Sequence, residues 1–227
     1  YSAFHLNASY DLLECTYDDL IIQGQAQMNE NEAFFQLADR YKKDKAIFIA
    51  DRNYESFNGF EHIVHSGNKY MIRVKDIDSK TSITRSFGPF EDSEFDIDVS
   101  RLLTRRSTNY IKDHPELYKL MPKKQRFDYF DNDLNIAYEF HSRIVRFKIS
   151  EDTYECIMTN LDKTEFSSEE IKELYHKRWG IETSFRELKY AIGLSALHSK
   201  KRESIKQEIY ARLLLYNFSQ SSKLLLC

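Results

Sequence analysis

The chain has 227 residues, and its 33 Lys and Arg residues against 36 Asp and Glu residues give a formal net charge of -3. This length fits one large domain or two small ones, and a hydrophobic content of 41% is enough to build a core. Six Gly and three Pro residues are too few for a collagen-like or low-complexity protein. No run approaches the roughly 20 apolar residues of a membrane-spanning helix, so we expect a cytoplasmic protein.

The first 75 residues predict alternating strands and helices. Two strands are expected between Ser2 and Gln23, followed by a helix that starts at a capping box of Asn29 and Glu32. The apolar run from Lys45 to Asp51 is typical of a strand covered on both faces. The remaining elements are a helix over Ser56 to His65 and a strand over Lys69 to Val74.

From Asp76 to Ile149 the pattern changes to short alternating segments, which predict a mostly β insertion. Its expected strands lie within Ser82 to Phe87, Phe95 to Val99 and Arg143 to Ile149.

Core-like character returns after this insertion, with a strand over Tyr154 to Thr159. One long helix is predicted from Phe166 to a stop near Gly193, because Ser167 and Glu170 form a second capping box. A final helix is expected from about Glu203 to Leu215 or beyond.

One segment of the long helix gathers polar side chains on a single face. At 100° per residue, an arc of about 60° contains Tyr175, Arg178, Glu182 and Lys189. The plain alternative is a surface helix with an ordinary i,i+4 ion pair between Arg178 and Glu182, and the spacing alone favours it. Against it stands the basic character of residues 172–206, with nine basic and four acidic residues.

Asp51 is the second candidate, because it closes the apolar run that starts at Lys45. Its carboxylate is expected at the carboxyl end of a central strand, where open α/β sheets bind ligands. An Asp at this place equally well caps the next turn, and both interpretations stay open. Asp51 and Glu182 together would suit hard divalent cations. Such ions catalyse phosphodiester cleavage, and neighbouring cations would hold the phosphates.

These residues resemble a known family. The order Tyr175, Arg178, Glu182, Lys189 has the Y-(2)-R-(3)-E-(6)-K spacing of DDE transposases of the insertion-sequence-four type, the YREK signature. The flanking segments are also similar to that family, and the resemblance covers nearly the whole chain. These segments are Arg178-Trp179-Gly180-Ile181-Glu182, Thr159-Asn160-Leu161-Asp162 and Ala50-Asp51-Arg52.

The resemblance implies an α/β protein with an RNase H-like mixed sheet flanked by helices and a β-rich insertion before the last catalytic helix. It makes Asp51 and Glu182 the second and third catalytic acids and ligands of Mg²⁺ (or Mn²⁺). It assigns phosphate contacts at the transposon end to Tyr175, Arg178 and Lys189. Trp179 packs either against DNA or into the core, and of these two the core is the favoured expectation.

The implied function is DNA end cleavage and strand transfer in DNA transposition. The implied partners are transposon ends and target DNA, and no membrane. A homodimer in the DNA complex is compatible with the resemblance. The implied location is the bacterial cytoplasm, in association with the nucleoid.

In this family the first catalytic Asp lies on the first strand of the fold, upstream of the paired strands that open this chain. We therefore expect residues 1–75 to be the first part of the catalytic domain without its first strand, residues 76–150 the insertion, and residues 151–227 the last core strand and the catalytic helices. A chain without that Asp is not expected to cleave DNA alone. The alternative is a catalytically inactive DNA-binding or interaction remnant of a transposase.

The run from Arg101 to Arg126 has eight basic and two acidic residues and lies within the predicted insertion. A solvated charged face and a contact with the DNA backbone explain it equally well.

Overall fold

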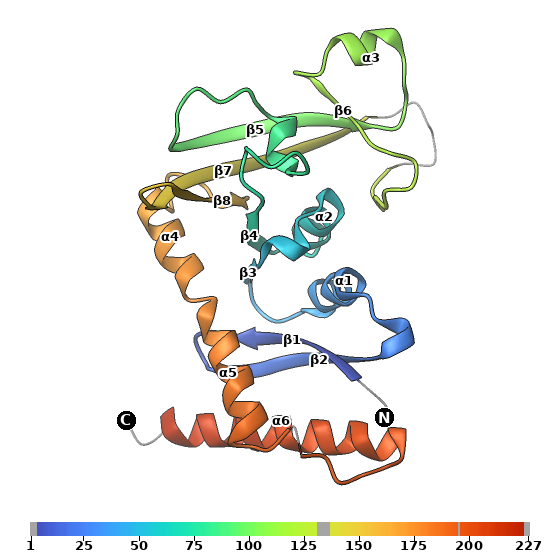
Figure 1. The fold of residues 1–227 in the computed structure, drawn as a ribbon, viewed down its shortest axis with the longest axis vertical. Helices are drawn as coiled ribbons and strands as arrows, with labels where there is room; N and C mark the ends of the chain where they lie inside the picture. Colours follow the sequence, from blue (N-terminus) through green and yellow to red (C-terminus); the bar gives the residue numbers. More distant parts are fainter. Residues whose placement is uncertain (1–3, 131–136, 195, 225–227) are drawn as a thin grey trace. The chain divides into compact units, whose positions relative to one another are not determined.

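A computed structural model describes residues 4–130, 137–194 and 196–224. It is an α/β structure whose largest sheet is a six-stranded mixed sheet, consistent with an RNase H-like fold (Figure 1). The chain forms two compact units, which we call the terminal unit (Tyr1–Arg40 with His176–Cys227) and the central unit (Tyr41–Tyr175). The predicted segment limits at residues 75 and 150 differ from these borders and stay a prediction.

The terminal unit is built on a two-stranded antiparallel sheet, in which Phe4 pairs with Gly24 and Asp11 with Thr16. Its core joins Tyr17 and Leu20 of the sheet to Leu188, Ile209 and other apolar residues of the C-terminal helices. The elements are β1 (Phe4–Asp11), β2 (Thr16–Gly24), the 3₁₀ turn η1 (Gln25–Gln27), α1 (Glu30–Arg40), α5 (Trp179–Tyr190) and α6 (Arg202–Leu224).

The central unit contains the six-stranded sheet, in the order β3-β4-β8-β7-β5-β6. Strands β3 and β4 run parallel, as do β5 and β6, and the other neighbours are antiparallel. The strands are β3 (Ile47–Ala50), β4 (Lys69–Val74), β5 (Phe95–Thr104), β6 (Tyr118–Leu120), β7 (Tyr138–Ser150) and β8 (Thr153–Thr159). The helical elements are η2 (Arg52–Tyr54), α2 (Phe57–His65), η3 (Ile83–Ser86), α3 (Asn109–Asp113) and α4 (Ser168–His176).

Strand β4 is buried on both faces, because successive side chains of a strand point to opposite sides of the sheet. On one side Tyr70 stacks on Phe60 of α2, with 4.9 Å between the ring centroids. The next residue, Met71, belongs to the core cluster that contains Ile171 and Tyr175 of α4. Helices α2 and α4 therefore contribute to separate cores around one strand.

The predicted capping residues start their helices as expected. Asn29 Oδ1 accepts a hydrogen bond from the Glu32 backbone N–H at 3.1 Å. Ser167 and Glu170 cap each other reciprocally: the Ser167 N–H donates to Glu170 Oε2 at 2.8 Å, and the Glu170 N–H donates to Ser167 Oγ at 3.3 Å. Gly193 adopts φ +74°, a left-handed conformation that suits a glycine after a helix.

Three predictions about helices and strands are wrong in the described residues. Residues 82–87 are not a strand: they contain the 3₁₀ turn η3, which Ser82 caps because its Oγ accepts from the Thr84 N–H and donates to the Lys75 carbonyl oxygen. The single helix predicted from Phe166 to Gly193 is two helices, α4 and α5, separated at Lys177 and Arg178. Strand β3 is an edge strand of the described sheet, not a central one.

Within the described part of the chain, no helix combines the length and apolar character needed to cross a lipid bilayer.

Candidate active site

Asp51 lies directly after β3, in the central unit. Its side-chain Oδ1 accepts a hydrogen bond from the Arg52 N–H, and its carbonyl oxygen accepts one from the Tyr54 N–H at 3.0 Å. The residue therefore sits at a strand end, as predicted, and also caps the turn η2. Its Oδ2 makes no hydrogen bond or ion pair that involves the described residues.

The turn after Asp51 is tied to the end of the neighbouring strand by Glu55. The Glu55 carboxylate accepts a hydrogen bond from the Lys75 N–H at 2.5 Å, and its Oε1 lies 3.5 Å from Lys75 Nζ. Because β3 and β4 are parallel, their carboxyl ends meet at one edge of the sheet. Glu55 thus fixes the backbone that carries Asp51 against the end of β4.

Glu182 lies in the first turn of α5, in the terminal unit. Its Oε1 is 2.7 Å from Nη1 of Arg178, the N-cap residue of the helix, so the ion pair that the i,i+4 spacing predicts is present. The Glu182 side chain is 43% exposed, and its Oε2 has no partner within the described ranges. The carboxylate is therefore oriented by Arg178 and still open to solvent.

The other two residues of the YREK signature lie in different surroundings. Lys189 is exposed on α5, seven residues after Glu182 and hence two turns further along the same face. Tyr175 is 3% exposed and packs in the core of the central unit, on the other side of the break between α4 and α5. Arg178, Glu182 and Lys189 thus share one face, as predicted. The prediction that Tyr175 lies on the same face relied on one continuous helix, and α4 and α5 are separate helices.

Trp179 is 58% exposed, so the prediction that it packs into the core is wrong. The Arg178 guanidinium lies 5.3 Å from the centroid of its ring, a cation–π distance. Arg178 is therefore held between an aromatic face and the carboxylate of Glu182.

Side chains of the Thr159-Asn160-Leu161-Asp162 segment, at the end of β8, bond to the backbone at the start of β4. Asn160 Oδ1 accepts from the Tyr70 N–H at 2.8 Å, and Thr159 Oγ1 donates to the Tyr70 carbonyl oxygen. Asp162 Oδ1 accepts from the Thr164 N–H at 2.7 Å and so forms the next turn. This family-like segment therefore has a structural role in the central unit.

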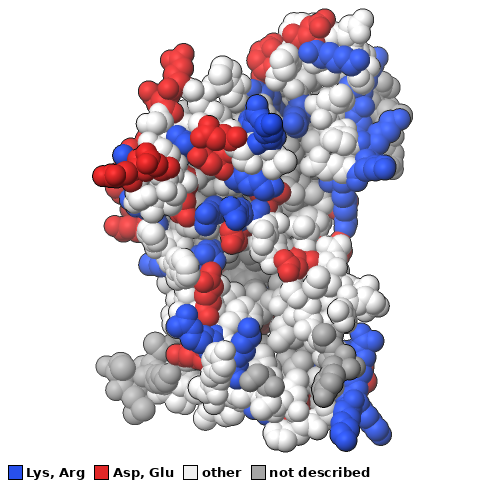
Figure 2. All heavy atoms as spheres, in the orientation of Figure 1, with Lys and Arg blue, Asp and Glu red and all other residues white. Residues whose placement is uncertain are grey.

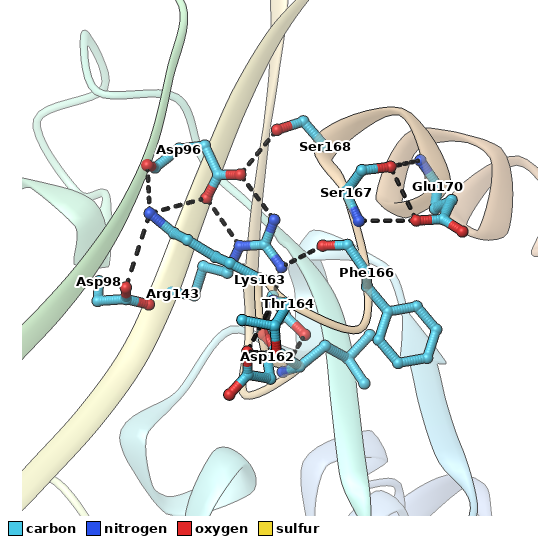
Figure 3. Close-up of polar contacts among 12 residues, drawn as sticks. Asp96, Asp98, Arg143, Asp162, Lys163, Thr164, Phe166, Ser167, Ser168 and Glu170 are labelled. Carbon is cyan, nitrogen blue, oxygen red and sulfur yellow. Dashed lines mark hydrogen bonds and ion pairs between the residues drawn. The ribbon is translucent and has the colours of Figure 1, made fainter.

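A buried arginine that the sequence analysis missed holds the connection from β8 to α4 (Figure 3). Arg143 is 2% exposed and makes two hydrogen bonds to Asp96, of 2.7 Å from Nε and 2.6 Å from Nη2. Its Nη1 donates to the carbonyl oxygens of Leu161 at 3.3 Å and Phe166 at 2.8 Å. The signal in the sequence is an arginine within the apolar run of β7, where a buried charge requires partners.

Asp96 completes this cluster. Ser168 Oγ, at the start of α4, donates to Asp96 Oδ2 at 2.7 Å, and Lys163 Nζ lies 3.4 Å from Oδ1 (Figure 3). Burial alone would raise the pKa of Asp96, but hydrogen bonds from Arg143 and Ser168 outweigh it and hold the pKa of this carboxyl below its usual range. The start of α4 is therefore fixed by charged hydrogen bonds.

A divalent cation fits the chemistry of the two predicted acids. Asp51 and Glu182 each keep one carboxylate oxygen outside the contacts described above, and Mg²⁺ is commonly bound by one or two carboxylates together with substrate phosphates. Among the residues with described positions, no group of three or more His, Cys, Asp or Glu side chains is arranged to hold a metal ion.

Comparison with known proteins identifies the family of this chain. The family model of the transposase DDE domain matches residues 1–218. The chain therefore belongs to the family of the transposase DDE domain.

Individual relatives come from insertion sequences of Escherichia coli. The putative transposase InsL for insertion sequence element IS186A, from strain K12, and the transposase for insertion sequence element IS421 are each 40% identical to this chain over 58 residues. This match covers 26% of the chain and 16% of each relative. The matched segment is thus a small part of the relatives' length.

Proposed function

We propose that the chain is the catalytic region of a bacterial DNA transposase that cleaves DNA at transposon ends and transfers the strand to target DNA. The observation that carries the proposal is the α5 face, where the largely buried Arg178 orients the 43% exposed Glu182 and the exposed Lys189 follows two turns later. The family match over residues 1–218 supports it. We place the protein in the cytoplasm, at the nucleoid, with a homodimer as its form in the DNA complex.

In this proposal the fold is RNase H-like. Asp51 and Glu182 bind Mg²⁺ or Mn²⁺. When bound, such ions activate water and stabilise the leaving oxygen in phosphodiester cleavage. Arg178 orients Glu182 through the 2.7 Å ion pair before DNA binds. Arg178 and Lys189 then bind DNA phosphates, whereas Tyr175, because it is buried, anchors the end of α4.

The second candidate function is a catalytically inactive DNA-binding or interaction remnant. It is favoured by the contacts of the two acids, because Asp51 caps η2 and Glu182 is paired with Arg178. Both are ordinary structural roles. In that case the α5 face acts as a clamp on the DNA backbone and needs no divalent ion.

The test is Mg²⁺-dependent nicking of transposon-end DNA by the full-length protein that contains these residues. Asp51→Asn and Glu182→Gln should each lower the nicking rate by about 100-fold or more, since each replaces a metal-binding carboxylate with a neutral amide of the same shape. Gel analysis of end-labelled DNA with and without Mg²⁺ measures the rate. Nicking that survives in either variant would overturn the site assignment.

Matched controls separate this effect from a general loss of negative charge. Glu187→Gln changes the same residue type on α5, five positions from Glu182 and on a different face, and Asp44→Asn changes an exposed Asp of the loop before β3. Both controls should nick at the wild-type rate. If the wild type and all variants bind DNA but none of them nicks it, the result would favour the inactive remnant.

A further inference from the structure

The carboxyl ends of β5 and β6 bring four basic residues to one edge of the central unit. The two strands are parallel, with Thr104 opposite Leu120, so the residues that follow them emerge together. Arg105 and Arg106 follow β5, and Lys123 and Lys124 follow β6 after two intervening residues. We call these four residues the basic edge.

The loops of the basic edge are fixed to each other. The Met121 N–H donates to the Thr104 carbonyl oxygen at 2.8 Å, which extends the pairing beyond the strands. Arg105 Nη2 donates to the Gln125 carbonyl oxygen at 3.0 Å, and its guanidinium lies 5.0 Å from the centroid of the Phe130 ring. The positions of the two loops are therefore coupled.

The lysines of the basic edge project into solvent. Lys123 and Lys124 are exposed and have no hydrogen bond or ion pair to the described part of the chain. The nearest acid in sequence is Asp128, and its carboxylate is engaged by Arg126 at 2.9 Å and by His62 at 3.0 Å. The other acids between the two strands are Asp113 and Glu116, against eight basic residues from Arg101 to Arg126.

The opposite end of the same sheet has the opposite charge. Residues 91–98, where β5 begins, contain five acidic and no basic residues, and residues 150–155, at the hairpin of β7 and β8, contain three acidic and no basic residues. In Figure 2 red side chains gather at the upper left, on the side of the β7–β8 hairpin in Figure 1, and blue side chains at the upper right, on the side of β6. Asp96 and Glu155 of these segments are paired with Arg143 and Arg73. The negative charge at this end therefore belongs to exposed acids such as Glu91, Asp92, Glu151 and Asp152.

We propose that the basic edge binds the phosphate backbone of duplex DNA, independently of sequence, and that the acidic end keeps the duplex away from the other end of the sheet. The inference rests on the proposed function, since it gives the transposase a second DNA contact outside the α5 face. Lys123 and Lys124 are exposed and have no acidic partner within the described residues, so they favour phosphates, because binding releases counterions from DNA. Negative charge at the far end selects the orientation of the duplex by repulsion.

The test is the salt dependence of binding to a 20-base-pair duplex, measured by fluorescence anisotropy in EDTA so that no metal chemistry contributes. Lys123→Gln/Lys124→Gln should lower the slope of log Kd against log salt concentration by about 2, since each phosphate contact contributes about 0.9. The loss should be the same for two duplexes of unrelated sequence. A slope equal to that of the wild type would overturn the inference.

The matched control is Lys42→Gln/Lys43→Gln, another exposed pair of consecutive lysines in the central unit, in the loop before β3. It changes the net charge by the same amount and should leave the slope at the wild-type value. Equal losses in both double variants, or no binding of DNA by the wild type at 50 mM salt, would contradict the inference. Asp51→Asn and Glu182→Gln should lose nicking but keep the wild-type slope of log Kd against log salt concentration. The proposal for the metal site and the proposal for the basic edge can therefore fail independently.

Discussion

The carboxylate of Glu182 has one structural and one proposed chemical role. Its 2.7 Å contact with Arg178 is the ion pair that helical spacing predicts, because residues four apart lie on one face. The same contact orients an oxygen that is open to solvent. Local periodicity thus predicts the pair, but it says nothing about a cation, since that depends on atoms outside the helix.

Glu61 is a buried acid that the sequence analysis did not identify. It is 4% exposed on α2, where the Tyr138 hydroxyl donates to its Oε2 and His65 Nε2 lies 3.8 Å away. Burial raises the pKa of Glu61, although the hydrogen bond from Tyr138 and the charge of His141 act in the opposite direction. The protonated form is therefore favoured more in the folded state than in the unfolded chain.

Glu61→Gln should remove this pH dependence. A group whose pKa is raised by folding stabilises the fold below its unfolded pKa, about 4.3 for Glu, and that stability is lost as the pH rises through the folded pKa. The variant, which keeps an acceptor for Tyr138, should gain stability relative to the wild type as the pH increases from 4.5 to 8. Urea unfolding across this range measures the difference, and a difference that does not change with pH would contradict the assignment.

At the scale of elements, Arg143 connects β5, β7 and the start of α4. Arg143→Met should cost about 3–5 kcal/mol, because the half-buried Asp96 carboxylate loses both hydrogen bonds from the buried guanidinium and two carbonyl oxygens lose a donor. Urea unfolding at neutral pH measures this loss.

The control for this substitution is Arg73→Met on β4, in the same sheet. Arg73 pairs with Glu155 at 3.2 Å, but its side chain is 31% exposed, and within the described residues this ion pair is its one side-chain contact of that kind. The expected cost is about 1 kcal/mol. Equal costs for the two arginines would show that the network in Figure 3 contributes no more than an ordinary ion pair.

The elements that sequence predicts well are those with local chemical signals. Asn29 and Ser167 cap α1 and α4 because their side chains accept hydrogen bonds within three residues. The break between α4 and α5 has no such signal, since neither Lys177 nor Arg178 opposes helix formation. It coincides with the border between the units: Tyr175 packs in one core and Leu188 in the other. The apolar residues that look like one helical stripe in the sequence therefore pack in two different cores. The spacing of apolar residues does not show this division.

At the scale of the whole molecule, the two proposed metal ligands belong to different units. Asp51 is in the central unit and Glu182 in the terminal unit. The α/β class follows from the alternation of predicted strands and helices, but the position of β3 at the edge does not, because strand order depends on pairing between distant residues. The net charge of -3 likewise conceals the separation of charge along the six-stranded sheet.

The central proposal is that Asp51 and Glu182 bind the same divalent cation, and localised cleavage by Fe²⁺ tests it most directly. Fe²⁺ takes the place of Mg²⁺ and, with ascorbate and peroxide, generates radicals that cut the backbone near the ion. The account predicts cuts close to residues 51 and 182 in the full-length wild-type protein, and loss of both cuts in Asp51→Asn and in Glu182→Gln. Cleavage at only one of these positions, or a cut at either position that survives both substitutions, would contradict it.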